Sequence, residues 1–268
     1  MIRTMGAFLW RDLHIEMSYN LSFFLQILGI FPSVLMFYFL SGLFGNTFLN
    51  PLKAYGGSYF PFVLIGVAVQ NYFTSALSSF AGGMREAQLS GTLEAVLTTP
   101  VSLPTFLFGS ALYAFVLNSI KIGIYLTVGC LIAGIVFDMG SVLEVLLAIA
   151  LSIAAFSSMG VFSASFIILF KKGDPLNWAF SVISWLLGGV FYPVSVLPDW
   201  LQTVSLFIPI THSLEILRAL LLGHGTLASV ASHILVLCVW AAVGLPVSYF
   251  CFLYALKRAR ITGSLGHY

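Results

Sequence analysis

The stretch VLEVLLAIALSIAAFSSMGVFSASFIILF, residues 142–170, decides the fold class of this chain. From Val145 to its end it contains no charged residue. It is longer than the roughly 20 apolar residues that a helix needs to cross the hydrocarbon core of a bilayer. Inside lipid, backbone amides and carbonyls must be satisfied within the segment, so a helix is the structure that such a stretch can adopt. We therefore predict a transmembrane α-helix here.

Five further stretches match or approach this one in length and apolar character. Together they predict an all-α integral membrane protein with six transmembrane helices, in a single domain that covers residues 1–268. The fifth span is short, and Pro193 interrupts it. The predicted spans are residues 21–44, 59–82, 105–137, 142–170, 177–197 and 230–256.

The composition supports a lipid environment. Of the 268 residues, 60% are hydrophobic and 7% are charged, and the mean hydropathy is +1.04. A soluble domain carries about 25% charged residues, so 11 basic and 9 acidic side chains could not cover a globule of this size. The net charge of +2 also argues against a nucleic-acid partner. We expect membrane lipid to contact most of the surface.

The positions of the basic residues predict how the chain lies in the membrane. Lysine and arginine are retained on the cytoplasmic side, and an even number of spans puts both termini on one side. With the N-terminus inside, two basic residues face outward, Lys53 and Arg218. Eight face inward, namely Arg3, Arg11, Arg85, Lys171, Lys172, Lys257, Arg258 and Arg260. We therefore predict cytoplasmic N- and C-termini.

Residues 1–20 precede the first span and have a helical pattern of their own. Apolar side chains recur every three or four positions, and Arg11 and Asp12 fall largely elsewhere around the helix. We predict an amphipathic helix that lies in the inner membrane interface, with an unstructured tail as the alternative. The apolar positions are Ile2, Met5, Leu9, Leu13 and Met17.

The predicted spans contain almost no ionisable groups. Ionisable residues inside a membrane are costly and usually serve the function, for example by binding the coupling ion of a carrier. Residues 21–44, 59–82, 145–170 and 177–197 contain none, and Lys121 alone lies near a midplane. Two interpretations of Lys121 stay open. It could line an internal cavity and attract an anionic head group or phosphate, or it could pair with backbone carbonyls and Asn118 at a helix contact.

The sequence also lacks the motifs of an ATPase or an enzyme. It contains no Gly-x-x-x-x-Gly-Lys-[Ser/Thr] loop, no clustered metal ligands and no nucleophile elbow. We expect a transport protein that is not itself an enzyme, binds no cofactor or metal of its own and receives its energy from outside the chain. An ion-coupled secondary transporter or channel is the alternative. A membrane enzyme acting on lipids would need a cluster of acids, histidines or nucleophiles.

The connection between the second and third spans, residues 83–104, is predicted to lie in the cytoplasm. Ser90 or Thr92 can cap a short helix that starts near Gly91 and ends at Pro100. One face of this helix is apolar, and water would not leave it exposed. We predict that it docks into a groove of a partner protein, with a helix lying on the membrane as the alternative. The apolar face consists of Leu89, Leu93, Val96 and Leu97.

Residues 198–229, between the fifth and sixth spans, predict two short outer helices. Pro198 starts the first and Pro209 ends it. Thr211 or Ser213 caps the second. Both helices are too short to cross the bilayer, so we predict re-entrant helices that dip into the outer leaflet or cap a pore.

Two segments resemble a known family, the type-2 ATP-binding-cassette (ABC) exporter permeases. The order of the predicted elements matches this family too, so the resemblance covers essentially the whole chain. The segment that resembles the family's coupling-helix motif is Glu86-x4-Gly91-Thr92-Leu93-Glu94-x2-Leu97-x-Thr99-Pro100-Val101-Ser102. The segment that resembles its fifth span and outer helices is Phe191-Tyr192-Pro193-x4-Pro198-x-Trp200-Leu201-Gln202, continuing through Pro209 and Arg218 to Gly223.

The resemblance implies an assembly with a separate motor. Such a permease is the transmembrane subunit of an ATP-driven exporter and works as a dimer, here expected to be a homodimer. Two copies of an ATPase subunit bind ATP and Mg. A bacterial inner-membrane location follows, as does an exported drug-like amphiphile, lipid-linked saccharide or polysaccharide. The residues implied to contact or adjoin the ATPase are Arg11, Asp12, Arg85, Glu86, Gly91, Leu93, Glu94 and Leu97.

The resemblance also implies a substrate route and an outer gate. Spans one, two and five should line the route and the dimer seam, although aromatic side chains at helical spacing also occur as packing or lipid contacts. Lys121 matches no motif of the family and is included for its depth. For Glu215 and Arg218, one turn apart, a plain stabilising pair is the alternative. The expected route residues are Phe31, Phe37, Tyr38, Tyr72, Phe73, Lys121, Trp185 and Tyr192, and the gate residues are Phe191, Pro193, Glu215 and Arg218.

Overall fold

The all-α prediction is confirmed over the part of the chain that the structure describes. The computed structural model describes residues 2–17, 20–44, 49–91, 98–99, 102–135, 137, 142–170, 174–222 and 225–261. Within these ranges every regular element is a helix. The apolar stretch 142–170, from which the fold class was predicted, forms the helix α8 (Val142–Phe170).

Among the described residues, five helical segments are long and apolar enough to cross a membrane. A sixth candidate is the pair α10 (Asp199–Ser205) and α11 (Pro209–Leu221), which is bent by 87°. The first segment, Phe24–Leu43, joins α2 (Asn20–Leu28) to α3 (Ile30–Phe44), and the last, Ala231–Ile261, joins α12 (Ala231–Val239) through a π-helical turn (Trp240–Gly244) to α13 (Leu245–Ile261). The other three are α5 (Tyr59–Leu89), α7 (Leu103–Ala133) and α8.

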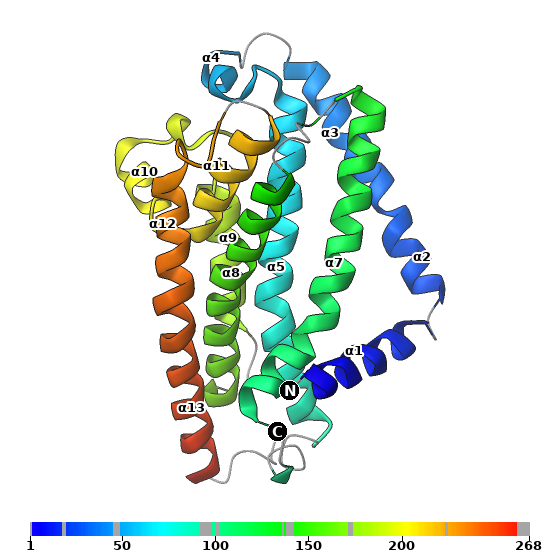
Figure 1. The fold of residues 1–268 in the computed structure, drawn as a ribbon, viewed down its shortest axis with the longest axis vertical. Coiled ribbons are helices and arrows are strands. Elements are labelled where there is room, and N and C mark those ends of the chain that lie inside the picture. The colour runs from blue at the N-terminus through cyan, green and yellow to red at the C-terminus, as the bar shows by residue number, and fades with distance from the viewer. Residues whose placement is uncertain are drawn as a thin grey trace.

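Helix α5 is the centre of the bundle. It packs against α3, α7, α8, α9 (Pro175–Leu187) and α11, and α8 packs in turn against α13. Figure 1 shows α1 (Ile2–Met17) lying across the lower end of the bundle, where α13 also ends. Helices α4 (Leu49–Leu52), α10 and α11 gather at the opposite end (Figure 1). We call these the α1 end and the α11 end.

Close packing between α5 and α8 depends on a small residue. A Cβ atom added to Gly160 would lie 2.5 Å from the carbonyl oxygen of Ala76, so the missing side chain lets the two backbones approach. Nearby, the buried rings of Phe73 and Phe156 pack edge to face with centroids 5.1 Å apart. Small residues commonly allow such close helix contacts in membranes, and this contact forms the core of the bundle.

The predicted fifth span, residues 177–197, is not a continuous helix. Helix α9 has 13 residues and ends at Leu187. At 1.5 Å per residue this is about 20 Å, which is shorter than the hydrocarbon core of about 30 Å. Gly189 has a φ of +78°, a left-handed conformation that favours glycine. The interruption therefore lies at Gly189, four residues before Pro193, the position at which the sequence predicted it.

The boundaries of the outer helices also differ from the prediction. Helix α10 starts at Asp199, directly after Pro198, as predicted. Helix α11, however, begins at Pro209, which occupies the first turn of the helix instead of ending the preceding one. The fixed φ and missing N–H of proline suit this position. The prediction that Thr211 or Ser213 caps the second helix is therefore wrong.

Helix α5 continues beyond the predicted end of the second span to Leu89. The hydroxyl of Ser90 donates to the carbonyl of Glu86 at 2.7 Å, and Gly91 has a φ of +66°. Ser90 and Gly91 therefore end α5. The prediction that Ser90 or Thr92 also caps the following helix depends on residues outside the described ranges and stays a prediction. The rest of the predicted docking helix lies outside the described residues, and its structure stays a prediction. This applies to Thr92, Leu93, Glu94 and Leu97.

The contact at Gly160 predicts a specific cost of adding one methyl group. In Gly160→Ala the new Cβ would meet the backbone of α5, so the helices must separate, and we expect a loss of about 1–3 kcal/mol. The matched control is Gly123→Ala on α7, where an added Cβ meets nothing within 4 Å. The melting temperatures of the detergent-purified variants measure the effect. Equal melting temperatures for the two variants would contradict this account of the α5–α8 contact.

Candidate functional site

A pocket of about 480 Å³ lies at the α1 end, between α1, the last turns of α5 and the first turns of α7. Arg11 and Asp12 line it from α1, and Glu86 lines it from α5. These are three of the residues that the sequence assigned to ATPase coupling. Hydroxyl groups and aromatic rings also line the pocket, namely those of Ser79, Ser90, Ser110, Phe8, Phe106 and Tyr113. Helices distant in sequence thus present their polar groups to one hollow.

Phe8 anchors α1 on α7. A Cβ atom added to Gly109 would lie 2.7 Å from the Phe8 ring, so the ring occupies the space that a side chain would need. Phe106, one turn earlier on α7, packs edge to face with Phe8 at a centroid distance of 6.2 Å. This contact fixes where α1 crosses the bundle, and it places Arg11 and Asp12 beside the end of α5.

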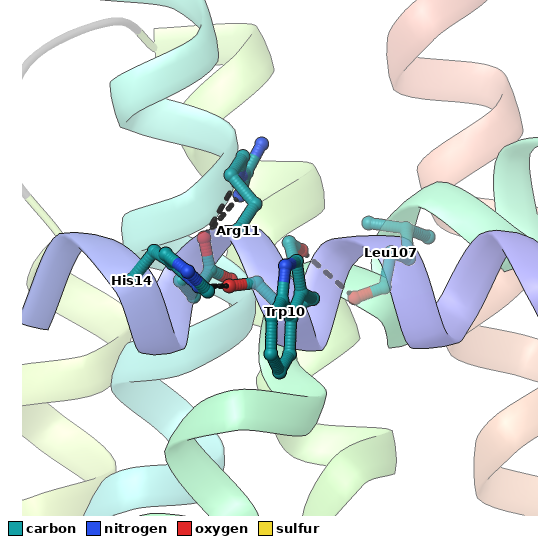
Figure 2. A network of polar contacts seen from close by, with 6 residues as sticks. Trp10, Arg11, His14 and Leu107 are labelled. Atoms are coloured by element: carbon teal, nitrogen blue, oxygen red, sulfur yellow. Dashed lines mark hydrogen bonds and ion pairs between the residues drawn. The ribbon is translucent and has the colours of Figure 1, made fainter. Parts of the chain in front are cut away.

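The polar residues of α1 are held by local contacts. The Nε and Nη2 atoms of Arg11 both lie 2.7 Å from Asp12 Oδ1, and the guanidinium lies 5.1 Å from the centroid of the Phe8 ring. The rings of Trp10 and His14 pack one turn apart, 4.4 Å between centroids. Figure 2 shows these α1 side chains together with Leu107 of α7. An exposed ion pair of this kind contributes about 0–1 kcal/mol to stability, so its main effect is to hold the charges in place.

The α5 part of this surface is exposed. Arg85, Glu86 and Leu89 are exposed in the last turns of α5, and Gly91 is exposed just after it. We use the name coupling site for Arg11, Asp12, Arg85, Glu86 and Gly91, the described members of the predicted set. Leu93, Glu94 and Leu97 follow directly in the chain and lie outside the described residues.

A second hollow, of about 360 Å³, contains Lys121. It opens between α2, α3, α5 and α7, and Lys121 Nζ donates a hydrogen bond to the side-chain oxygen of Gln26. Asn118 lines the same hollow and donates through Nδ2 to the carbonyl of Asn71 at 3.0 Å. Of the two interpretations given for Lys121, the structure therefore supports the one that places it on a cavity.

Two predicted route residues, Phe37 and Trp185, meet the predicted gate residue Phe191 in one aromatic cluster. Phe191 lies between Phe37 of α3, with which it stacks at 6.0 Å, and Trp185 of α9, at 5.1 Å. Tyr38 packs edge to face on Phe60 at 5.6 Å. Phe31 is exposed on α3. Phe37 and Phe191 pack against the core, whereas Trp185 is exposed on α9.

Three other route residues lie away from this cluster. Phe73 is fully buried against α8, and Tyr72 is buried with its hydroxyl hydrogen-bonded to Ser119 of α7. The hydroxyl of Tyr192 donates to the carbonyl of Leu186, which fastens the turn after α9. The structure thus brings Phe37, Phe191 and Trp185 together but places Phe73 within the packed core.

At the α11 end, Arg218 joins three parts of the chain. It is 1% exposed, and its guanidinium donates to the carbonyls of Phe62 at 3.1 and 3.3 Å, Gly189 at 2.9 Å and Val190 at 3.1 Å. Its central carbon also lies 3.4 Å from the centroid of the Phe62 ring. A Cβ atom at Gly66 would lie 2.3 Å from the Val190 carbonyl oxygen, so this glycine allows the close approach. We call this arrangement the arginine junction.

Glu215 contributes to the same region through a different partner. The phenol of Tyr55, in the 3-10 turn Lys53–Tyr55, donates to Glu215 Oε1 at 2.7 Å. Burial, and next the neighbouring Glu215 carboxylate, raise the pKa of Tyr55 above its ordinary value, so the phenol keeps its proton and remains a donor. Arg218 also contacts Tyr55, since its central carbon lies 5.8 Å from the centroid of the Tyr55 ring. Glu215 and Arg218 thus meet at Tyr55, and both tie α11 to the region around α5. Pro193 is buried next to the junction turn.

Two histidines that are 21 residues apart in the sequence meet at this end. His212 of α11 and His233 of α12 lie with their Nδ1 atoms 2.8 Å apart. The Nε2 atom of His212 lies 2.8 Å from the carbonyl oxygen of Leu206 and must donate to it. His212 Nδ1 is then an acceptor, and His233 donates to it. This pair links α11 to the last span.

A comparison with known protein families decides what the chain is. The family model described as "ABC-2 type transporter" matches residues 9–222, a range that contains the whole coupling site and the whole arginine junction. The chain belongs to the ABC-2 type transporter family. The resemblance found in the sequence is therefore confirmed, and the chain is a permease of this family, a membrane transport subunit that is not itself an enzyme.

Curated relatives of the permease carry transport and nodulation names. Nodulation protein J of Rhizobium leguminosarum bv. trifolii is 28% identical over 198 residues, 70% of this chain and 71% of the relative. Nodulation protein J of Rhizobium meliloti (strain 1021) is 26% identical over 224 residues, 81% of this chain and 82% of the relative. The inner membrane transport permease YadH of Escherichia coli (strain K12) is 26% identical over 187 residues, 68% of this chain and 70% of the relative.

Some functional contacts of the permease could not be found from the sequence. Phe8 and Gly109 form the α1 anchor, but a glycine within an apolar stretch is a weak signal. Tyr55 lies in a loop, with no pattern that connects it to Glu215 in a helix 160 residues later. A signal did exist for Arg218, because an arginine in an apolar outer helix needs partners. The sequence suggested Glu215 as that partner, whereas the recorded hydrogen bonds of Arg218 go to backbone carbonyls.

The arginine junction predicts an ordered series of stabilities. Arg218→Met leaves buried carbonyls without donors and should cost about 3 kcal/mol or more, since each unsatisfied group costs about 1–3 kcal/mol. Arg218→Lys keeps the charge but not the planar fork and should lie between the wild type and Arg218→Met. Arg260→Met, at an exposed position of α13, is the control and should be nearly neutral. Melting temperatures and protease resistance of the segment between α9 and α11 report the order. If Arg218→Met behaves like the control, the junction does not hold this end together.

Proposed function

We propose that this permease is the membrane subunit of an ATP-driven exporter in a bacterial inner membrane, coupled to a separate ATPase at the coupling site. The observation that carries the proposal is the pocket at the α1 end. There an anchored amphipathic helix and the end of α5 present charged groups directly before the segment that resembles a coupling helix. Such a surface suits a partner that pushes on α5 and α1 together.

The proposed topology has six crossings and cytoplasmic termini. The basic residues support it. Arg11 belongs to α1, Arg85 to the last turns of α5 and Lys257 to the last turns of α13, whereas Lys53 directly follows α4 and Arg218 belongs to α11. Helices α4 and α11 lie at the end of the bundle opposite α1 (Figure 1). In this arrangement α9 carries the chain part of the way across, and the bent pair α10 and α11 completes the fifth crossing as a re-entrant outer element. The inner-membrane location is also supported by the relative YadH, which is named an inner membrane transport permease.

The proposed assembly is a homodimer with two ATPase subunits. Helices α2, α3 and α9 expose large apolar side chains along surfaces that the rest of the bundle does not cover, and these suit either lipid or a second copy of the permease. They include Phe24, Leu25, Leu28, Met36, Phe39, Trp178, Trp185 and Leu186. ATP and Mg would be bound by the ATPase alone.

The proposed cargo is a drug-like amphiphile, a lipid-linked saccharide or a polysaccharide. The aromatic cluster of Phe37, Trp185 and Phe191 supports an amphipathic or glycan cargo, because aromatic rings bury large areas beside polar groups. In the proposed route the cargo passes this cluster, while Phe191, Pro193, Glu215 and Arg218 hold the outer gate. An ion-coupled transporter or channel is the competing function, and ATP dependence separates the two.

The coupling proposal is tested with the permease purified from its own membranes. A tagged wild-type permease should capture an ABC ATPase from detergent-solubilised membranes. Glu86→Ala and Arg11→Ala should lower the ATP turnover of the captured complex about fivefold or more, since truncating a central interface contact costs about 1 kcal/mol or more. Lys257→Ala, at an exposed site on α13, is the control at the same end. If no ATPase is captured and transport follows an ion gradient alone, the exporter proposal fails.

The topology is tested with two single cysteines. Lys53→Cys should react with a membrane-impermeant maleimide in intact spheroplasts, whereas Lys257→Cys should react only after permeabilisation. The wild type is the background control, because Cys130, Cys238 and Cys251 lie within predicted spans. Labelling of Lys257→Cys in intact spheroplasts would reverse the proposed orientation.

A further inference from the structure

The cavity that contains Lys121 is polar, although the helices around it are apolar. It lies beside Gly29, at the break between α2 and α3, and close to the middle of α7. Its described lining includes one cationic side chain and no aspartate or glutamate. The polar side chains that line it are Gln26, Ser33, Asn71, Asn118, Lys121 and Tyr125.

The donors in this cavity converge from two sides. Lys121 carries up to three N–H donors, and Gln26 receives one of them through its side-chain oxygen. The amide of Asn118 is held by the carbonyl of Asn71, which fixes its position on the wall. The lining thus offers positive charge and N–H groups.

The buried hydroxyl of Tyr125 gives independent support for ligand binding in this cavity. The residue is 3% exposed, yet its hydroxyl has no hydrogen-bond partner among the described residues. Ser33 is the nearest polar side chain and interacts with this hydroxyl, but the two groups do not meet with hydrogen-bond geometry. A buried hydroxyl without a partner costs about 1–3 kcal/mol, so its presence on the cavity wall points to a group that the hydroxyl contacts when the cavity is filled.

The surroundings of the cavity suit an alkyl chain. Leu25 lines the cavity and is 54% exposed, and the neighbouring surface of α2 and α3 exposes Phe24, Leu28, Phe31 and Leu35. A molecule with its polar end beside Lys121 could lay an apolar tail along these side chains. The volume of about 360 Å³ lies within the range of about 300–1,000 Å³ that is usual for small-molecule sites.

We propose that this cavity binds the phosphate-like anionic head group of an amphiphile, with its alkyl chain on the exposed surface of α2 and α3. Lys121 supplies the charge, and the hydroxyls of Tyr125 and Ser33 donate hydrogen bonds to the oxygens. The head group comes from a membrane phospholipid or from the exported molecule. The second source rests on the proposed function and would narrow the cargo to anionic amphiphiles.

The test measures binding to the permease alone, in phosphatidylcholine nanodiscs, without ATPase or ATP. The probe is dodecyl phosphate, and the matched neutral probe is dodecanol. Dodecyl phosphate should bind the wild type saturably, and Lys121→Gln should weaken it about tenfold or more, as expected for losing a charged hydrogen bond. Lys121→Arg should stay within about threefold of the wild type. Dodecanol should not distinguish the variants.

Two further variants serve as controls for indirect effects of the Lys121 substitutions. Tyr125→Phe removes only the buried hydroxyl and should weaken dodecyl phosphate about threefold or more while leaving the melting temperature of the empty protein unchanged or higher. Lys53→Gln removes an exposed lysine at the α11 end and should bind like the wild type. Equal affinity of the wild type, Lys121→Gln and Tyr125→Phe for dodecyl phosphate would overturn the proposal, as would Lys121→Arg binding as weakly as Lys121→Gln.

Two arms separate the sources of the head group. A phospholipid occupant predicts an anionic lipid in native mass spectra of wild-type permease taken from membranes, absent from Lys121→Gln, with no effect of dodecyl phosphate on ATP turnover. An exported occupant predicts that dodecyl phosphate raises the ATP turnover of the wild-type complex but not that of Lys121→Gln. Failure of ATPase capture would leave the binding result intact, so the cavity and the exporter proposal fail separately.

Discussion

The α11 end of this permease depends on one buried cation that faces backbone carbonyls. Helix α9 stops at Leu187, so the carbonyls of Gly189 and Val190 have no following helical turn to satisfy them. In a membrane each such group would cost several kcal/mol. Arg218 donates to both and to Phe62 of α5. Arg218 therefore stabilises three features at once: the break after α9, the close approach at Gly66 and the position of α11.

Much of the fold follows from the sequence because lipid imposes a simple rule. Long apolar stretches must become helices, and this rule gave α5, α7, α8 and the last span close to their observed positions. The end of α9 could not be predicted, because the turn at Gly189 is stabilised by an arginine that comes 29 residues later. Serine and glycine occur at both the starts and the ends of helices, so Ser90 and Gly91 did not show from sequence alone that α5 continues to Leu89.

The candidate site was predictable in part. Arg11, Asp12 and Glu86 were assigned to one surface from a family resemblance, and the structure places them around one pocket. The contacts that hold them there, Phe8 on Gly109 and the partner of Lys121 on α2, arise from tertiary packing and leave no local pattern. Helix α5 connects the two regions, since Phe62 at the arginine junction and Glu86 at the coupling site belong to one unbroken helix. A rigid-body displacement of α5 would therefore move Phe62 and Glu86 together.

The anchor of α1 has a consequence for how the permease is made. Phe8 needs Gly109, and the ribosome adds that residue about 100 residues later, or about 5–20 s at usual rates of synthesis. During this interval the first helix has no α7 to pack against. The contact between Phe8 and Gly109, which fixes where α1 crosses the bundle, therefore forms only after α7 has been synthesised.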